Sequence, residues 1–420
     1  MHASLMIRDR LKARRFKDNV IVILLFFIIP WLVYALGVDV TTQSLAAGDG
    51  VIYGYPTKAY SAGGSLWNPY VTGGTYTVKD VGAQTVYPLN VVMMLFPNMF
   101  GFNVFLMLHY SLGGIFTFLY LRSIELEMRA AFLGGIVFMF SGFMAAHLGH
   151  HSMVSAAVYA LLILYAVEKY LKKNHFGFLL LGAGALALSI LADYLAVTFY
   201  TGMIVLPYII YRSIAAGKTA RKGARKVILD VVKLILAIFL GGVLLAMVYV
   251  LPVIESLPYA TRESVSYEFF SSYNFPAFML PMLLFPFLYG GTNVFYFMGP
   301  WNFSELSGYM AILVVIVAGG AFLALRKKNS LVWFWAIVAV AGFVLTLGAD
   351  TPVYNLMYQM PGYNMFRAPA RNWYEVNFAF TILFAIGLDY LLKVSENRRA
   401  RKLYTNKLIK ISVLVGAVAV

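Results

Sequence analysis

The chain contains no cysteine and few charged residues, and both scarcities restrict what it does. Without cysteine, disulfides, thiolate catalysis and cysteine-based metal sites are excluded. Charged residues make up only 12% of the 420 residues, and 61% are apolar, against about 25% charged in a typical soluble domain. This composition excludes a soluble enzyme, a disordered tail and a nucleic-acid-binding domain, although the net charge is +15. It indicates an integral membrane protein.

Long apolar runs predict an all-α bundle of about 10–11 membrane spans. An eleventh run begins near Ile409, and because Val420 falls inside it, we expect the natural protein to continue past this residue. Segment 276–291 is also apolar, but three prolines interrupt it, so we expect it to be re-entrant or to lie in the membrane interface. The ten complete runs lie near residues 19–38, 102–121, 129–146, 152–168, 176–192, 194–211, 231–251, 308–325, 331–348 and 375–392.

Basic residues predict the orientation of these spans. Cytoplasmic loops of membrane proteins carry an excess of Lys and Arg. If the N-terminus is cytoplasmic and the spans alternate, 28 of the 33 basic residues fall inside and five outside. The basic clusters 212–233 and 393–410 are then topology signals that also suit anionic lipid. The five outside cations are Lys58, Lys79, Arg262, Arg367 and Arg371.

This frame divides the chain into three parts. Residues 1–18 form a basic cytoplasmic N-terminus, residues 19–392 form the membrane domain, and residues 393–420 form a basic loop and the start of a further helix. Long segments that are too extended to be simple turns all fall on the outer face, where we expect function to reside. These segments are 39–87, 252–307 and 349–374.

The first outer loop, residues 39–87, is rich in motifs. Asp49 stands between Gly48 and Gly50, and flanking glycines allow a tight turn and a close approach of a ligand to the carboxylate. Asp49 is therefore our candidate general base; an ordinary turn is the equally weighted alternative. Aromatic residues are common at any membrane interface, so the aromatics of this loop prove little by themselves. Our candidates for substrate binding in the loop are Tyr53, Tyr55, Trp67 and Asn68.

Histidines gather in an H-L-G-H-H motif at the outer end of the third span. Spacings of three and four residues suit one face of a helix, as a metal site would need, but Gly149 and the helix end argue against a regular helix here. We therefore favour hydrogen bonding of His147 and His150 to a polar ligand or to the first outer loop. A metal site and simple interfacial polarity are the remaining alternatives.

A turn between two spans, at residues 193–194, carries Asp193 on the outer side. Aspartate is a preferred N-cap residue because its carboxylate accepts backbone N–H groups of the first helical turn. We therefore expect Asp193 to cap the helix that follows.

Arg367 and Arg371 lie four residues apart, just before the tenth span. Arginine suits bidentate binding of phosphate, and outside placement runs against the positive-inside bias. One helical turn apart, the two side chains are predicted to form an anion clamp, rather than to snorkel at a helix end. Arg262 is a weaker third candidate for this role.

Several of these motifs together resemble the bacterial YfhO family of membrane proteins. The matching segments are the G-D…Y-P element at 48–56, W-N-P-Y at 67–70, Y-P-L-N at 87–90, S-G-F-x-x-x-H-x-G-H at 141–150 and F-R-A-P-A-R at 366–371. None is specific alone, but their order matches over residues 48 to 392. The family belongs to the C-type (GT-C) glycosyltransferase superfamily. Its members are typically much longer than this chain.

The resemblance implies a multi-spanning enzyme that takes a sugar from a polyprenyl-phosphate carrier. The sugar passes, outside the cytoplasm, to a cell-envelope acceptor such as teichoic acid. An essential aspartate of the superfamily maps onto Asp49, and Arg367, Arg371 and Arg262 are the residues expected to bind the donor phosphate. The implied partners are the sugar-bearing lipid, the glycopolymer acceptor and membrane lipids, without nucleic acid. The resemblance leaves open whether a divalent cation takes part, and we assign no metal ligand.

A transporter or flippase of lipid-linked saccharides is the main alternative function. It would use the same outer cations and apolar groove but has no need of an outward-facing base. A transporter should also carry polar residues deep in its spans, and here the middles of the apolar runs are nearly free of charge. A structural scaffold, the third alternative, leaves the motifs of the outer loops unexplained.

Overall fold

The computed structural model describes most of the chain as helices. The described residues are 2–71, 73–78, 80, 82–259, 265–291, 296–394, 405–406 and 408–413, with side chains from residue 18 onward. Arg262 and Lys79, and most of the predicted segment 393–420, lie outside them. The longer helices are α1 (His2–Tyr34), α4 (Met99–Ser123), α5 (Met128–Met139), α8 (Tyr159–Lys173), α9 (Phe176–Leu191), α10 (Leu195–Thr219), α11 (Ala224–Ile235), α16 (Ile312–Leu325), α17 (Ser330–Thr346) and α19 (Trp373–Val394).

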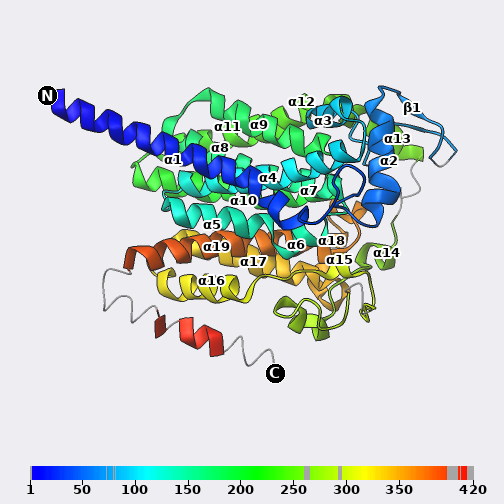
Figure 1. Cartoon of the computed structure of the whole chain (residues 1–420). Helices are drawn as coiled ribbons and strands as arrows, with labels where there is room; N and C mark the ends of the chain where they lie inside the picture. The colour runs from blue at the N-terminus through cyan, green and yellow to red at the C-terminus, as the bar shows by residue number, and fades with distance from the viewer. Residues whose placement is uncertain are drawn as a thin grey trace.

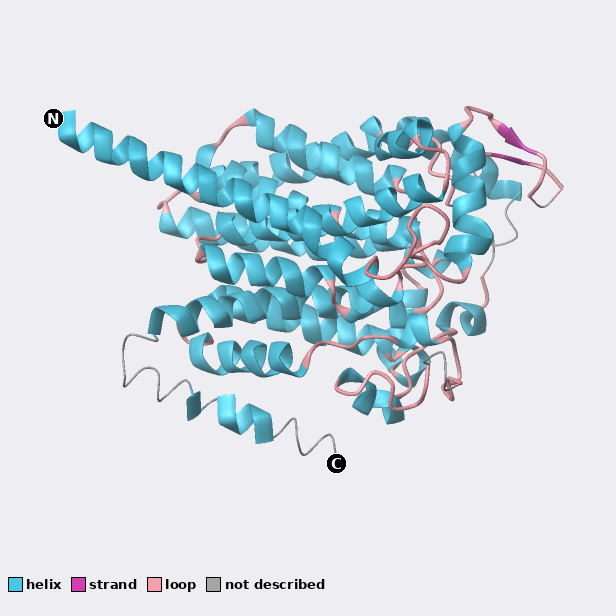
Figure 2. Cartoon of the chain, in the orientation of Figure 1, coloured by secondary structure: helices cyan, strands magenta, loops and turns pink. Residues whose placement is uncertain are grey.

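Short helices fill the connections and continue some of the long helices after a break. They are α2 (Tyr55–Ala62), α3 (Val91–Leu95), α6 (Gly142–Ala146), α7 (His151–Ala157), α12 (Gly241–Leu245), α13 (Met247–Ser256), α14 (Tyr267–Ser271), α15 (Phe303–Leu306) and α18 (Pro352–Tyr358). Figure 2 shows how helix dominates the molecule. The segment predicted to be re-entrant contains only the 3-10 helix Ala277–Leu283, so residues 276–291 form no helix of spanning length.

Six helical stretches among the described residues are long and apolar enough to cross a membrane. Five further apolar helices of 10–17 residues accompany them, among them Asp18–Tyr34 and Ile312–Leu325. A helical multi-pass architecture is therefore confirmed in its coarse form, and the count of 10–11 spans stays a prediction. The six long stretches are Met99–Ser123, Met128–Ala146, His151–Lys173, Leu195–Thr219, Ala224–Leu245 and Pro369–Val394.

Small residues bring the helices of the bundle close together. A Cβ added to Gly135 of α5 would lie 2.8 Å from the carbonyl oxygen of Gly114 on α4. Likewise, a Cβ on Gly387 of α19 would lie 2.7 Å from the carbonyl oxygen of Val317 on α16. Membrane helices associate through such close backbone contacts because lipid supplies no hydrophobic driving force between them. These glycines therefore set the distances of α4–α5 and α16–α19.

The three long segments 39–87, 252–307 and 349–374 lie together at one end of the bundle, which we call the loop end (Figure 1). Backbone hydrogen bonds join segments far apart in sequence: the N–H of Ala370 donates to the carbonyl of Tyr273 (3.1 Å), and that of Phe275 to Thr346 (2.8 Å). The three segments therefore lie at the same end of the bundle. Which side of the membrane the loop end faces stays a prediction.

One β-hairpin interrupts the predicted all-α fold. Strands β1 (Trp67–Asn68) and β2 (Thr75–Tyr76) pair antiparallel, with Trp67 opposite Tyr76. Gly74 has a φ of +116°, and a Cβ there would overlap the Trp67 ring at 2.2 Å. Because only glycine fits that turn, the Gly73-Gly74 pair produces a hairpin that helix patterning does not reveal.

The charge bias and the loop end together predict the outcome of thiol labelling. Because the chain has no cysteine, single cysteines at Ser65 and Asn302 of the loop end should react with an impermeant thiol reagent in intact cells. A cysteine at Lys222, between α10 and α11, should react only after the membrane is permeabilised. Labelling of position 222 in intact cells would contradict this orientation.

Candidate functional site

The site is built where the first outer loop meets the break between α6 and α7, residues 147–150, which we call the histidine turn. A Cβ added to Gly149 would lie 2.5 Å from the carbonyl oxygen of Ala47, and one on Gly50 would lie 3.1 Å from that of Gly149. Only glycine allows so close an approach of two backbones. The contact places Asp49 beside His150, and the predicted break in the helix at Gly149 is confirmed.

Asp49 precedes a short π-helical turn, Gly50–Gly54, and its side chain is 76% exposed. Its Oδ2 lies 3.5 Å from Nε2 of His150, whose own side chain is 25% exposed. Burial, and then the neighbouring His147, lower the pKa of His150 to about 4. At neutral pH a neutral imidazole therefore stands beside an accessible carboxylate.

His147 is buried and lies next to His150, with the ring centroids 5.3 Å apart. Its Nδ1 is 2.7 Å from the carbonyl oxygen of Phe143, which indicates an N–H at Nδ1. Its Nε2 has no hydrogen-bond partner among the described residues and lies 3.7 Å from Oε2 of Glu305. His147 therefore links the histidine turn to a buried carboxylate.

Glu305 of α15 is 4% exposed and pairs with Arg371 in a two-point contact. Nε of Arg371 donates to Oε2 at 2.9 Å, and a second, shorter contact joins the other nitrogen and oxygen. The Arg371 charge lowers the pKa of Glu305 well below its ordinary value, against the effect of burial. Together, five residues from four separate segments form a polar chain: Asp49, His150, His147, Glu305 and Arg371.

Sequence reasoning missed Glu305. The residue occupies the third position of α15, where the side chain of Asn302 accepts a hydrogen bond from its backbone N–H at 3.2 Å. An Asn followed three residues later by Glu is typical of a helix start, so the pattern suggests a cap and conceals the ion pair. Only the approach of Arg371, 66 residues later, gives Glu305 its role.

Arg367 and Arg371 do not lie one helical turn apart, as the prediction assumed. Ala368 between them has a left-handed φ of +69°, and Pro369–Asn372 form a 3-10 turn. Arg371 lies over the ring of Tyr194 (5.6 Å to the centroid) in addition to its pairing with Glu305. The two guanidinium groups therefore have different partners, and their joint binding of an anion stays a prediction.

Arg367 is half-buried between two aromatic rings. Its guanidinium carbon lies 5.2 Å from the ring centroid of Phe269 and 5.1 Å from that of Tyr273. No carboxylate among the described residues pairs with it. Stacking on aromatic faces leaves the N–H edge of a guanidinium able to donate to an anion.

Of the two tyrosines predicted for substrate binding, Tyr53 lies within the π-helical turn and Tyr55 directly follows it, at the start of α2. Tyr53 is 37% exposed and its hydroxyl makes a short hydrogen bond with Asp80. The ring of Tyr55 packs on Phe102 of α4, at 5.8 Å. Tyr53 thus stays accessible at the surface, whereas Tyr55 anchors the loop to the bundle.

Trp67 and Asn68 lie in the β-hairpin. The Trp67 ring packs edge-on against Tyr76 at 5.2 Å, and the buried Asn68 side chain accepts the N–H of Tyr70 at 3.0 Å. These contacts lie within the hairpin, and neither residue contacts the polar chain. Their role in substrate binding stays a prediction.

The first outer loop is fastened to the bundle by a second, buried group of polar residues. Lys58 is fully buried, donates to Oε1 of Gln84 at 2.7 Å and lies 3.8 Å from the ring centroid of Phe105. Burial lowers its pKa well below the ordinary value. The amide of Gln84 in turn donates to the carbonyl of Ala192 at 2.6 Å, so the loop is joined to the turn after α9.

The prediction that Asp193 caps the next helix is wrong. Tyr194 occupies the N-cap position of α10, and Asp193 has a left-handed φ of +65°. Its carboxylate instead accepts the N–H of Gly82 at 2.7 Å and the hydroxyl of Tyr249. Burial raises the pKa of Asp193 to about 7. Long-range contacts, which a local pattern cannot show, decide the role of this residue.

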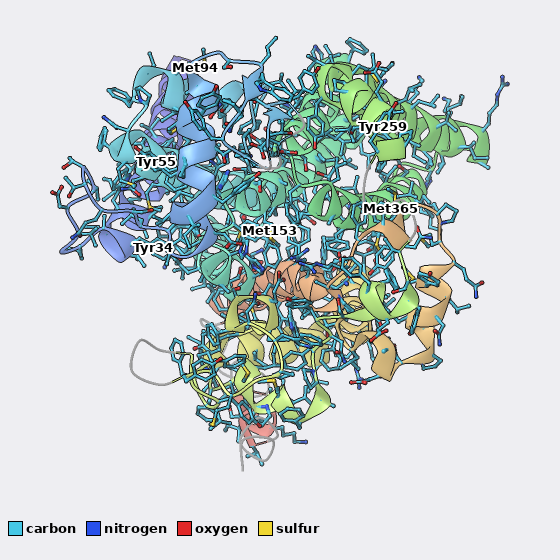
Figure 3. All side chains as sticks on the ribbon, turned by 90° about the vertical axis from the view of Figure 1, so that its right-hand side faces the viewer. Tyr34, Tyr55, Met94, Met153, Tyr259 and Met365 are labelled. Carbon is cyan, nitrogen blue, oxygen red and sulfur yellow. The ribbon has the colours of Figure 1, made fainter. Side chains whose placement is uncertain are left out.

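Figure 3 looks onto the loop end. Tyr34, Tyr55 and Met94 lie on one side of this face, Met365 on the other, and Met153 of α7 near the middle. Helix α7, which begins directly after the histidine turn, therefore lies between the first outer loop and residues 366–371, which we call the arginine segment. His151, next to the turn, binds the first loop directly, since its Nε2 lies 2.7 Å from the carbonyl of Gly82.

Among the residues that the structure describes, no three histidine, aspartate or glutamate side chains are arranged to hold a metal ion. In comparisons with known proteins, no family model matches the chain and no curated protein sequence is similar to it.

The polar chain predicts that Glu305 is critical for stability. Glu305→Gln leaves the buried Arg371 charge without a counter-charge, which typically costs about 3–5 kcal/mol. We expect a large fall in the melting temperature in detergent, with no fall for Glu255→Gln, because Glu255 is exposed. The double variant Glu305→Gln, Arg371→Gln should be more stable than the sum of the single effects. Equal melting temperatures for wild type and Glu305→Gln would contradict this assignment.

Proposed function

We propose that the chain is a membrane glycosyltransferase of GT-C-like architecture that uses a polyprenyl-phosphate-linked sugar and an extracytoplasmic cell-envelope acceptor. One observation carries the proposal. Three of the segments that resemble the YfhO family, around Asp49, His147 and Arg371, are about 100 and 220 residues apart in sequence and meet in one polar chain. Contact between the motifs supports a common site.

Asp49 is the general base of this proposal. Its carboxylate is exposed and stands on a loop whose backbone the histidine turn fixes in place. A base needs to reach the hydroxyl of the acceptor while its own position is restricted. Asp49 combines both properties.

The donor phosphate is assigned to the arginine segment. The Arg367 guanidinium is stacked on two rings and has no carboxylate partner in the described part of the chain, and so it is the first contact we assign to the phosphate. Arg371 is more deeply buried and contributes positive charge to the same segment, although Glu305 offsets part of this charge. Cationic side chains there stabilise the charge that develops on the leaving phosphate.

An apolar groove near this segment suits the lipid tail. It has a volume of about 500 Å³ and opens between α16, α17 and α19, lined by residues such as Ala318, Ile337 and Phe380. Phe380 follows Arg371 by nine residues, so at about 1.5 Å per helical residue the groove begins roughly 14 Å deeper in the bundle. A lipid whose phosphate lies at the arginine segment would place its hydrocarbon chain in this groove.

Asp49→Asn should abolish sugar transfer but leave expression and lipid-donor binding largely unchanged. Loss of a general base typically lowers turnover by about 10²–10⁴-fold. Asp39→Asn is the matched control, since Asp39 lies in the same loop and its carboxylate accepts hydrogen bonds only from Thr41 and Thr42. The measurement is radiolabelled transfer from a polyprenyl-phosphate sugar in proteoliposomes. A flippase, in contrast, would keep its lipid translocation in Asp49→Asn.

Arginine variants separate phosphate binding from a structural role. Charge-assisted hydrogen bonds to phosphate are worth about 1.5–3 kcal/mol each, so Arg367→Ala should weaken donor binding by more than tenfold with little change in melting temperature. Arg367→Lys should restore only part of the affinity, because lysine lacks the planar fork. Arg371→Ala should lower both affinity and melting temperature, since it also leaves Glu305 unpaired. Lysine variants equal to wild type at both positions would defeat the phosphate assignment.

A further inference from the structure

The backbone of Asp49 is held by the histidine turn, but its side chain has a single polar partner among the described residues. No side-chain capping bond holds the carboxylate at the start of the π-helical turn. Among the described residues, only Nε2 of His150, at 3.5 Å, pairs with it. The orientation of an exposed carboxylate with one protein partner depends on that partner.

His150 is itself held in place on several sides. Its backbone N–H donates to the carbonyl of His147 at 2.8 Å, and its ring lies beside the His147 ring. Nδ1 of His150 is buried and has no hydrogen-bond partner among the described residues, and Nε2 is the nitrogen that lies nearest the carboxylate. The adjacent Gly149 fixes the distance between the two segments.

Burial, more than the charged groups around it, keeps the His150 imidazole neutral. Burial is the largest effect that lowers its pKa, followed by His147, and Arg371 acts in the same direction. Glu305 and Asp49 act in the opposite direction and do not overcome the burial. A neutral imidazole with its proton on Nε2 can donate a hydrogen bond to a carboxylate, and the proton itself stays on the imidazole.

We propose that His150 is the positioning residue for Asp49: its neutral Nε2–H donates to one carboxylate oxygen and turns the other towards the acceptor hydroxyl. This role rests on the proposed transferase function. In the step, the acceptor oxygen bonds to the anomeric carbon of the sugar while the bond from that carbon to the phosphate oxygen breaks. The electron pair leaves with the phosphate, and the hydroxyl proton goes to the free oxygen of Asp49.

Two substitutions at position 150 test the role. His150→Ala should lower kcat by about tenfold to a hundredfold, the usual effect of a misplaced catalytic group, with an unchanged KM for the lipid donor. His150→Gln keeps an N–H donor near the Nε2 position and should restore most of kcat. His175→Ala, at an exposed histidine outside the site, is the control.

Gly149→Ala tests the same geometry with His150 intact. The added Cβ would meet the carbonyl of Ala47 at 2.5 Å, which pushes the first outer loop away from the histidine turn. We expect the same fall in kcat as in His150→Ala, again with an unchanged KM for the lipid donor. A purely structural role for these residues would lower the melting temperature but leave the kcat of the folded protein unchanged.

A measurement without substrate makes the inference independent of turnover. The chain has six histidines, so NMR of histidine-labelled protein, with His150→Gln for assignment, gives the His150 pKa directly. We expect a value near 4 that falls further in Asp49→Asn, because the carboxylate favours the charged imidazole. A His150 pKa near 6.5, or one that Asp49→Asn leaves unchanged, overturns the inference.

The transfer assay distinguishes this inference from the proposed function. Wild-type transfer that Asp49→Asn abolishes, but whose kcat His150→Ala leaves unchanged, overturns the positioning role alone. No transfer by the wild-type chain overturns the proposed function, and the NMR titration then still decides whether His150 and Asp49 interact.

Discussion

The ion pair between Glu305 and Arg371 is the contact on which the loop end depends. It joins the segment before α16 to the entrance of α19, and both side chains are nearly buried. Burying two charges is costly unless the geometry is good and the remaining polar atoms are satisfied. The two-point contact gives Glu305 and Arg371 this good geometry. On the other side, Glu305 faces His147. The pair therefore sets where the histidine turn, and with it the first outer loop, can lie.

The membrane architecture could be predicted because its physical signal is local and strong. Each apolar run needs only its own length and composition to indicate a span, and Gly149 is enough to predict the break at the histidine turn. Prolines likewise explain why residues 276–291 form no spanning helix. The hairpin at Trp67 escaped prediction because a single glycine conformation, and not a periodic pattern, produces it.

The site could be predicted only in part, since its members depend on contacts across hundreds of residues. Asp49, His147 and His150 were identifiable as polar residues in unusual local settings, and the structure brings all three together. Glu305 and Lys58 carried no local signal, because an ion pair and a buried ammonium are defined by distant partners. For Asp193 the local signal was misleading. The turn favours a helix cap, whereas the Asp193 carboxylate accepts hydrogen bonds from the N–H of Gly82 and the hydroxyl of Tyr249.

The burial of Lys58 has a consequence for how the protein is assembled. Gln84, which accepts from Lys58, donates to the carbonyl of Ala192. The ribosome synthesises Ala192 and Asp193 about 135 residues after Lys58. At roughly 5–20 residues per second of synthesis, that delay is about 7–27 s. During that time the ammonium group has no enclosed environment and stays hydrated. The first outer loop therefore docks late, after α9 and the following turn have been synthesised, although the loop itself is an early segment of the chain.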